Sequence, residues 1–440
     1  MKKIGIIGLG YVGLVSGAGI SDFGHKVICA DIDKKKIENI KKGNIPFFEP
    51  GLKELIDRNV KSNRLLFSTD ISNTIKKSDI IFIAVGTPEG DLGQADLSHV
   101  FDVALKIAKK MNNYKIICTK STVPVGTGNK IKEIINKNKS NSVEFDYVSN
   151  PEFLREGSAV KDFLWPDRVV IGCESNRVFD IMIEVYQPLF RNKKPIMQTE
   201  ISTAEMVKYA SNAFLALKIS YINEIANLSE TLGCDVKMVA NLIGQDGRIS
   251  PKFLHPGPGY GGSCFPKDTK ALVDLAKQAG VPIKTITAAI EANKYQKERM
   301  FIKLKKLLKE NVKGKTISIL GLSFKPNTSD IRESSSIDII SRILKAGGHI
   351  RAFDPVANNS MKKIFPNIEY FSNWEKTVEN SDCVVIMTEW NEFRSLDLIE
   401  LRDRLKTPVL FDTRNIFDQS KLLELGFSFD TVGRNKNINY

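Results

Sequence analysis

Cys264 is the residue whose type and surroundings point most directly to chemistry. It lies in the stretch Gly259–Asp268, just after a cluster of glycines, and Lys267 and Asp268 follow it three and four residues later. A nearby ammonium favours the thiolate, which is the nucleophilic form of cysteine. Glycines let the backbone approach a ligand closely because they carry no Cβ. The stretch predicts a reactive thiol, and on these residues alone a loop with a buried, inert cysteine is the alternative.

The other cysteines give no comparable signal. Cys29, Cys118 and Cys383 lie in apolar, strand-like runs, which predicts that they pack in a core. None of the six cysteines belongs to a CxxC pair or to a cysteine–histidine cluster, and the chain has only four histidines. We therefore expect no metal site.

The N-terminal residues predict a dinucleotide-binding loop. A short apolar strand at 3–7 leads into Gly8-Leu9-Gly10-Tyr11-Val12-Gly13, a helix is expected at 14–22, and a strand at 26–30 ends at Asp31. In this order the glycines allow a tight turn and the close approach of a pyrophosphate, which the helix N-terminus attracts. Asp31 would accept hydrogen bonds from ribose hydroxyls and would repel a 2′-phosphate. The pattern therefore predicts NAD as the cofactor, in preference to NADP.

Polar side chains follow further predicted strands. Strands at 78–85 and 114–119 lead to Thr87 and to the pair Ser121 and Thr122. Ligands of a doubly wound sheet bind outside the carboxyl ends of the strands, so we expect these hydroxyls near cofactor or substrate. Taken singly, each is equally compatible with an ordinary turn or cap.

Two carboxylates follow a strand expected at 146–150. Pro151 predicts a helix start, and on such a helix Glu152 and Glu156 would share one face. Carboxylates at this edge of the sheet could order a catalytic water or bind the cofactor. Two acidic residues on one helix face are otherwise simply solvated.

Residues 203–232 form an uninterrupted helical pattern, with Ser202 and Glu205 as a capping box. At a rise of ~1.5 Å per residue the helix is about 45 Å long, which suits a connection between two domains and a homodimer interface. Lys208 and Asn212 are four residues apart and so face the same way. An ammonium beside an amide can polarise an oxygen of a reacting group. Taken alone, a pair of this kind is more typical of ordinary surface residues.

The C-terminal part of the chain repeats the N-terminal pattern. Strand-like runs at 315–320, 349–353, 381–386 and 408–412 echo the first ones, and Ser323 stands where the second glycine of the fingerprint would be. We expect a second Rossmann-like domain, which need not bind NAD. Cations that flank its loops could clamp phosphates, or could be ordinary solvated side chains: Lys325, Arg332 and Arg414.

These elements predict an α/β fold with two Rossmann-like doubly wound domains, joined by a long central helix and a helical middle domain. A chain of 440 residues is too long for one core, and we expect domains at 1–200, 201–300 and 301–440. No apolar run approaches the roughly 20 residues that span a bilayer, and the chain begins directly with a strand, without the features of a signal peptide. We expect a cytoplasmic protein with no membrane partner.

The net charge is +13, and the lysines are spread along stretches that look like solvated helix faces. No nucleic-acid recognition motif accompanies the charge, so we expect no nucleic-acid partner. A positive field also suits a small anionic substrate such as a nucleotide sugar.

Taken together, these motifs resemble the UDP-glucose/GDP-mannose dehydrogenase family. The matching segments are 8–13, 121–127, 150–160 with 166–168, the pair Lys208 and Asn212, 257–268 and 321–336. The strand pattern extends the resemblance to the end of the chain. It implies an NAD-dependent, four-electron oxidation of the sugar C6 alcohol to a carboxylate, through a thiohemiacetal and a thioester on Cys264.

The resemblance also implies a role for each matching residue. Cys264 would be the nucleophile, Lys208 and Asn212 would stabilise the oxyanion, and Asp268, Thr122 and Glu152 would order water and move protons. Besides the loop at 8–13, the implied cofactor contacts are Asp31, Lys36, Thr87, Ser121, Thr122, Glu156, Lys267 and Arg332. The implied substrate contacts are Glu152, Phe153, Leu154, Lys208, Asn212, Phe253, Leu254, His255, Gly257, Tyr260, Gly261, Lys325, Arg332 and Arg414. Arg248 would reach the active site of a partner subunit.

The choice of substrate is less sharply implied. The segments around Glu152 and Cys264 are more similar to the UDP-glucose branch, since Ser263 stands where the N-acetylmannosamine branch tends to carry histidine. GDP-mannose and a UDP-N-acetylhexosamine stay open as substrates of the same chemistry. A two-electron hydroxyacid-type dehydrogenase and a non-catalytic nucleotide-binding protein are further alternatives, but neither needs a nucleophilic cysteine.

Overall fold

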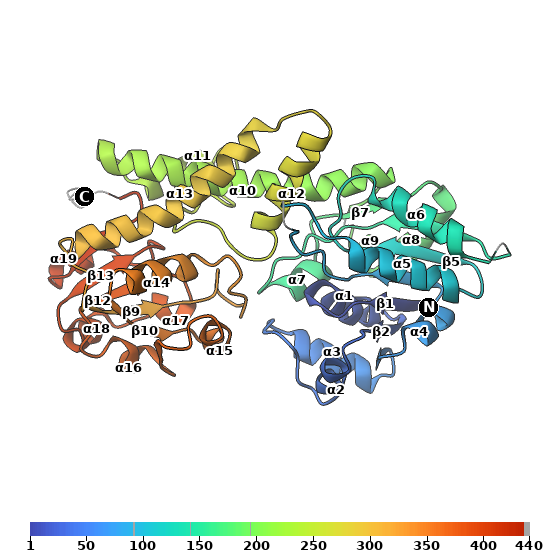
Figure 1. The fold of residues 1–440 in the computed structure, drawn as a ribbon, viewed down its shortest axis with the longest axis horizontal. Coiled ribbons are helices and arrows are strands. Elements are labelled where there is room, and N and C mark those ends of the chain that lie inside the picture. Colours follow the sequence, from blue (N-terminus) through green and yellow to red (C-terminus); the bar gives the residue numbers. More distant parts are fainter. Residues whose placement is uncertain (91–92, 141, 194, 435–440) are drawn as a thin grey trace. The chain divides into compact units, whose positions relative to one another are not determined.

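The computed structural model describes residues 1–90, 93–140, 142–193 and 195–434. The chain forms two compact units, Met1–Ser211 and Asn212–Tyr440, and the boundary falls within helix α10 (Ile201–Leu232). This helix, the long green ribbon of Figure 1, confirms the one predicted at 203–232. Each unit is built around a sheet of its own.

The sheet of the first unit has the strand order β3-β2-β1-β4-β5-β6-β7-β8 and is parallel except where β6 meets β7. Its strands are β1 (Lys3–Ile7), β2 (Lys26–Ala30), β3 (Leu65–Ser68), β4 (Ile80–Ile83), β5 (Lys115–Thr119), β6 (Phe145–Ser149), β7 (Val169–Gly172) and β8 (Ile196–Thr199). Its helices are α1 (Tyr11–Asp22), α2 (Lys34–Lys41), α3 (Leu52–Lys61), α4 (Ile71–Lys77), α5 (Ser98–Lys110), α6 (Thr127–Asn138), α7 (Ala159–Leu164), α8 (Asn176–Val185) and α9 (Gln187–Arg191).

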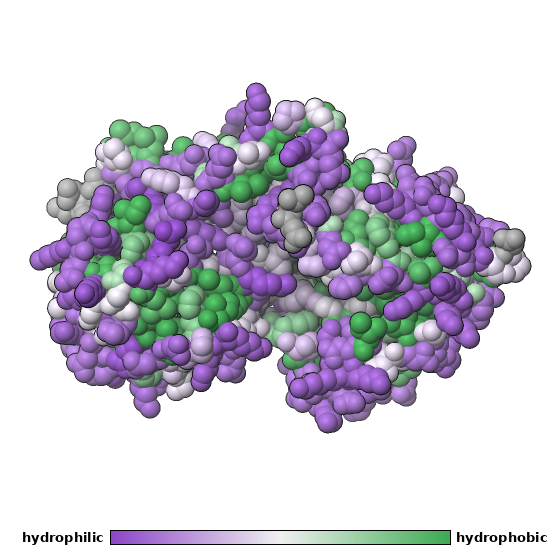
Figure 2. Space-filling view, viewed as in Figure 1, coloured by the Kyte–Doolittle hydropathy of each residue, from purple (hydrophilic) through white to green (hydrophobic). Residues whose placement is uncertain are grey.

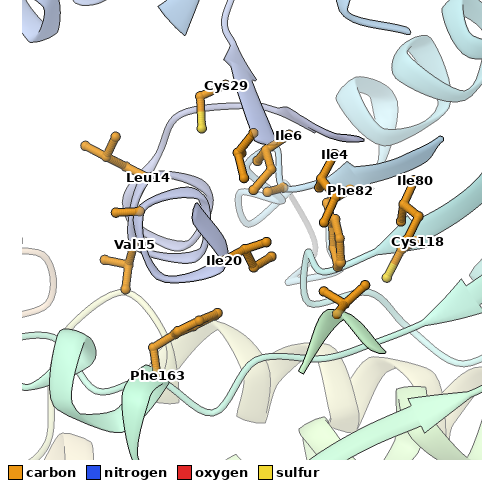
Figure 3. Packing of buried hydrophobic residues seen from close by; sticks show 14 of the residues in the cluster. Ile4, Ile6, Leu14, Val15, Ile20, Cys29, Ile80, Phe82, Cys118 and Phe163 are labelled. Atoms are coloured by element: carbon orange, nitrogen blue, oxygen red, sulfur yellow. The ribbon is translucent and has the colours of Figure 1, made fainter. Parts of the chain in front are cut away.

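Both faces of this sheet are buried, as expected where helices cover a parallel sheet. Side chains alternate along the strands, so that Ile6 of β1 packs in one hydrophobic cluster and Ile7 in another. Figure 3 shows the first cluster, in which Leu14 and Val15 of α1 lie with strand residues and with Phe163. Cys29 and Cys118 are buried in it, which confirms their predicted packing role.

The second unit holds the rest of α10, a helical middle part and a parallel sheet in the order β11-β10-β9-β12-β13-β14. The strands are β9 (Thr316–Leu320), β10 (His349–Phe353), β11 (Glu369–Tyr370), β12 (Cys383–Ile386), β13 (Val409–Asp412) and β14 (Ser428–Thr431). The helices that follow α10 are α11 (Val236–Gly244), α12 (Phe265–Gln278), α13 (Lys284–Leu307), α14 (Ser335–Lys345), α15 (Asn358–Lys362), α16 (Trp374–Val378), α17 (Asn391–Arg394), α18 (Leu398–Arg404) and α19 (Gln419–Glu424).

The predicted repeat extends to individual hydrogen bonds. The amide of Leu9 donates to Asp31 Oδ2 over 2.8 Å, and the amide of Leu322 donates to Asp354 Oδ2 over the same distance. Ser323, which replaces the second glycine, gives its hydroxyl and its amide to Asp354 as well. The second sheet is therefore Rossmann-like, with its strand-end aspartate held by the protein itself.

The helix expected to start at Pro151 is wrong, because residues 151–158 form a loop and α7 begins only at Ala159. Two local features oppose a helix there. Gly157 has a φ of +80°, which lies outside the helical region, and the carboxylate of Glu152 accepts a hydrogen bond from the amide of Leu154. Glu152 and Glu156 therefore do not share a helix face.

The surface of each unit is largely hydrophilic on the face that Figure 2 shows. Among the described residues, every helix is too short or too polar to cross a lipid bilayer.

Candidate active site

The loop after β1 has the shape that a dinucleotide needs. Gly8 has a φ of +98°, and a Cβ there would lie 2.7 Å from the carbonyl oxygen of Ala84. A Cβ on Gly13 would lie 1.9 Å from the carbonyl oxygen of Gly8, so both positions require glycine for the protein's own packing. A Cβ on Gly10, the N-cap of α1, would meet nothing within 4 Å. That open space in front of a helix N-terminus fits a pyrophosphate.

Asp31 ends β2 as an ordered carboxylate. It accepts hydrogen bonds from the amides of Leu9 and Asp33, and Lys36 Nζ lies 2.9 Å from its Oδ2. Burial alone would raise the pKa of Asp31, but these hydrogen bonds outweigh it and hold the pKa below its ordinary value. The negative charge fits an unphosphorylated ribose, and Lys36 contributes by pairing with Asp31.

Glu49 is a buried residue that the sequence analysis missed. Its carboxylate accepts a hydrogen bond from the hydroxyl of Tyr11 and others from the amides of Gly157 and Ala159, at 2.6 and 2.7 Å. It thereby ties the first residue of α1 to the loop that carries the buried Glu156. Gly157 and Ala159 lie 108 and 110 residues from Glu49 in the chain, so the local sequence pattern holds no signal of these contacts.

The loops after β4 and β5 are fastened to each other. Thr87 Oγ1 donates to the carbonyl oxygen of Thr122 over 3.0 Å, and Ser121 Oγ donates to the carbonyl oxygen of Val85 over 2.7 Å. Thr87 and Ser121 are buried, whereas Thr122 and Val12 are partly exposed. The predicted hydroxyls thus lie together at one edge of the sheet.

A buried ion pair joins α10 to the loop after β6. Lys208 Nζ lies 2.9 Å from Glu152 Oε1, and both side chains are only 4% exposed. Two cations lie over the ring of Phe153, Arg168 at 3.5 Å and Lys208 at 5.6 Å from its centroid. Removing one partner of such a pair leaves the other charge buried and costs about 3–5 kcal/mol.

Glu205 does not cap its own helix, so the predicted capping box is wrong. Its carboxylate accepts hydrogen bonds from the amides of Gly126 and Gly128, at 2.8 and 2.7 Å, and so caps α6. Burial raises the pKa of Glu205 to about 7, although the two amides act in the opposite direction. The first turn of α10 is thereby fixed to the loop that follows Thr122.

In the second unit, Cys264 is the N-cap of α12. The start of a helix favours the thiolate, because unpaired N–H groups and the positive end of the dipole lie there. Pro266 lies in the first turn, where the fixed φ of proline suits a helix start. The cysteine is partly exposed, and its sulfur lies 3.6 Å from Ser263 Oγ.

Asp268, one turn further along α12, is 1% exposed and accepts two side-chain hydrogen bonds. Asn212 Nδ2 donates to its Oδ2 over 2.6 Å, and Lys267 Nζ lies 2.5 Å from its Oδ1. The amide of Asp268 donates to the carbonyl oxygen of Cys264. The structure therefore places four predicted residues, Cys264 among them, in one cluster.

The segment 253–262 is a loop that contacts α13 and the loop after β9. Asn293 of α13 binds the amide and the carbonyl oxygen of Tyr260, at 2.7 and 3.1 Å. A Cβ on Gly261 would lie 2.3 Å from the carbonyl oxygen of Glu333, so this glycine serves close packing of two chain segments. Phe253 has a φ of +66°, Leu254 is buried and His255 is exposed.

The predicted cations differ in their surroundings. Arg414 donates to the carbonyl oxygens of Met387 and Phe324 and would lie 3.5 Å from a Cβ on Gly257. Lys325 Nζ lies 5.3 Å from the ring centroid of Phe324. Arg332 and Arg248 have side chains 63% and 90% exposed, and each pairs with the aspartate two residues before it.

Three family models match the chain. The NAD-binding domain of the UDP-glucose/GDP-mannose dehydrogenase family matches residues 2–190, its central domain 202–295 and its UDP-binding domain 318–419. The residues matched by the first model include the dinucleotide loop, and those matched by the second include Cys264.

Full-length relatives agree with these models. The UDP-glucose 6-dehydrogenase TuaD of Bacillus subtilis is 47% identical over 435 residues, which is 99% of this chain and 94% of the relative. The UDP-glucose 6-dehydrogenase of Rhizobium meliloti is 46% identical over 98% of this chain and 99% of the relative. A UDP-glucose dehydrogenase structure from Pyrobaculum islandicum has a TM-score of 0.91, 33% identity and coverage of 99% and 98%. The predicted resemblance is confirmed, and the chain belongs to the UDP-glucose/GDP-mannose dehydrogenase family.

Proposed function

We propose that this chain catalyses the NAD-dependent oxidation of UDP-glucose to UDP-glucuronate, with Cys264 as the nucleophile. The observation that carries the nucleophile assignment is the placement of Cys264 at the N-cap of α12, one turn before the Asp268–Asn212 pair. The preference for UDP-glucose is supported by the two relatives above, which are 46–47% identical and named for this substrate.

The reaction removes two hydrides from C6 of the sugar, and NAD supplies the hydride acceptor for each oxidation. Loss of the first hydride and of the hydroxyl proton gives an aldehyde. The Cys264 thiolate adds to the aldehyde carbon and forms a thiohemiacetal, from which loss of the second hydride gives a thioester. Water adds to the thioester carbon, the C–S bond breaks, and the thiolate and the carboxylate are released.

The remaining residues have roles that their contacts and the family resemblance support. Lys208 and Asn212 would stabilise the negative oxygen of the tetrahedral intermediates. Asp268, Thr122 and Glu152 would order the attacking water and move protons. The cofactor would be held by the loop at 8–13 with Asp31, Lys36, Thr87, Ser121, Glu156, Lys267 and Arg332, and the nucleotide sugar by the segment 253–261 with Phe153, Leu154, Lys325 and Arg414.

We also propose three domains, at 1–200, 201–300 and 301–440, a cytoplasmic location, and a homodimer that forms through α10. Phe214, Tyr221 and Leu228 support the dimer, because they are 60%, 50% and 53% exposed and seven residues apart along the helix. Such spacing places them on one face. Arg248, whose side chain is 90% exposed, would reach the active site of the partner.

The test measures NADH formed per UDP-glucose consumed, together with a panel of UDP- and GDP-sugars. Two NADH per sugar are expected, and one would exclude the four-electron reaction. Cys264→Ala should abolish formation of UDP-glucuronate, and unchanged turnover would exclude the nucleophile. Cys234→Ala, at an exposed cysteine of the same unit, is the matched control and should keep full activity.

A further inference from the structure

Lys120 is a buried lysine that the reaction above does not use. It directly follows β5, and the residue is 4% exposed. Its ammonium lies 3.1 Å from Asn150 Oδ1, 3.5 Å from the carbonyl oxygen of Asn150 and 3.4 Å from the hydroxyl of Tyr186. Across the described ranges, no carboxylate forms an ion pair with it.

A cation in this setting works against stability. Moving an ammonium out of water costs several kcal/mol unless a counter-charge compensates, and neutral oxygens compensate only in part. Burial lowers the pKa of Lys120 to about 8, with the nearby Glu152 acting in the opposite direction. The side chain is therefore mostly charged near neutral pH, which suggests a use for the charge.

Lys120 lies where two catalytic loops begin. Ser121 and Thr122 follow it directly, and Asn150, which its ammonium binds, stands two residues before Glu152. Asn150 also accepts a hydrogen bond from Tyr186 over 2.6 Å and donates to the carbonyl oxygen of Val170 over 2.7 Å. The ammonium thereby belongs to the network that fixes the start of the Glu152 loop.

The titratable groups that face this ammonium come from four elements. They are Cys118 on β5, Tyr186 at the end of α8, Glu152 in the loop after β6 and Lys208 on α10. Burial raises the pKa of the Cys118 thiol and of the Tyr186 phenol, so both stay neutral around neutral pH. Glu152 is the carboxylate of the group and forms an ion pair with Lys208.

We propose that Lys120 is a positioning residue for the oxidation at C6, whose ammonium holds the start of the Glu152 loop through Asn150 and Tyr186. The inference rests on the proposed function, because Glu152 has to act during turnover.

The chain offers a matched control on the same strand. Lys115, at the other end of β5, is 0% exposed, and its ammonium donates to the carbonyl oxygen of Ser78 and to Asn113 Oδ1, both over 2.7 Å. The two lysines are five residues apart, which is about 16 Å along a strand. Lys115→Met thus removes a buried ammonium away from the catalytic edge.

The test compares kcat and KM for the native protein, Lys120→Met and Lys115→Met, after two NADH per UDP-glucose have been established for the native protein. Lys120→Met should lower kcat roughly tenfold, because the Glu152 loop loses the ammonium that holds it. Its KM for NAD should change little. Lys115→Met should keep the native kcat, and Tyr186→Phe, which keeps the ammonium, should lose less of kcat than Lys120→Met.

Stability provides an independent check that the Lys120 ammonium is buried and charged. Lys120 has a lower pKa in the folded chain than its ordinary 10.5, so the free energy of unfolding should rise between about pH 8 and 10.5. Lys120→Met should lack this rise and be no less stable than the native protein at pH 7. An unchanged kcat in Lys120→Met, the same kinetic loss in Lys115→Met, or failure of only Lys120→Met to fold would each overturn the proposal. Absence of turnover in the native protein would instead refute the proposed function.

Discussion

At the scale of single residues, Asp268 is a buried carboxylate with a partner for each of its two oxygens. Its two oxygens receive Asn212 and Lys267 separately, and it is 1% exposed. Asp268→Asn replaces one acceptor by a donor and brings two amides face to face. We expect kcat for UDP-glucose oxidation to fall by about two orders of magnitude, with a smaller change in KM, in steady-state assays.

The control for Asp268→Asn is Asp274→Asn on the same helix, where Asp274 accepts a hydrogen bond from the exposed Gln278. It should keep the native rate. A rate for Asp268→Asn that is indistinguishable from this control would remove Asp268 from the catalytic group.

Asp31 gives a prediction that links cofactor binding to pH. Its folded pKa lies below its ordinary value of 3.8, so its stabilising contribution is present above about that pH and is lost as the pH falls through the folded value. Asp31→Asn should therefore lower the free energy of unfolding at pH 7 by more than at pH 3, as measured by urea denaturation. The same substitution should also raise the KM for NAD and reduce the preference for NAD over NADP. An equal loss of stability at both pH values would contradict the charge argument.

At the scale of elements, Glu205 joins two helices whose relative placement matters for Thr122 and Lys208. Its pKa is raised to about 7 from an ordinary 4.5, so the folded chain binds more protons than the unfolded chain between these values. The free energy of unfolding should therefore fall by up to about 3 kcal/mol from pH 4.5 to pH 7 on account of this group. In Glu205→Gln this fall should disappear, whereas Glu200→Gln, at an exposed carboxylate of the same region, should retain it.

Elements also show what the sequence could predict. Strands such as β1 and β5 were predictable to within a residue because their apolar runs are buried on both faces. The sequence analysis does not predict β7 and β8. It predicts a helix where residues 151–158 form a loop, because the features that oppose the helix are a positive φ at Gly157 and hydrogen bonds within the loop. The contacts of Glu49 and Lys120 could not be predicted, because hydrogen-bond partners of both residues come from segments that are distant in the sequence. The residues that do chemistry carry motifs, whereas those that hold them in place do not.

At the scale of the whole molecule, the proposed dimer requires an apolar surface that a second copy of the chain can cover. Phe214, Tyr221 and Leu228 form an apolar stripe on the part of α10 that belongs to the unit Asn212–Tyr440. A second copy of the chain would bury this stripe. Large exposed aromatic side chains in a row are unfavourable in a monomer and are typical of an interface. The native protein should therefore have the mass of a dimer in light scattering.

Phe214→Glu combined with Tyr221→Glu should convert that dimer into monomers, because two carboxylates on the same face would be buried against two others. Ile399→Glu on α18, where the side chain is 51% exposed, is the matched control and should stay dimeric. If Arg248 completes the active site of the partner, the monomer should also lose most of its turnover. Mixing the double variant with Arg248→Ala should then restore no turnover, because the double variant cannot pair with the second chain. A native monomer with full activity would refute both the dimer and the role of Arg248, while leaving the chemistry at Cys264 intact.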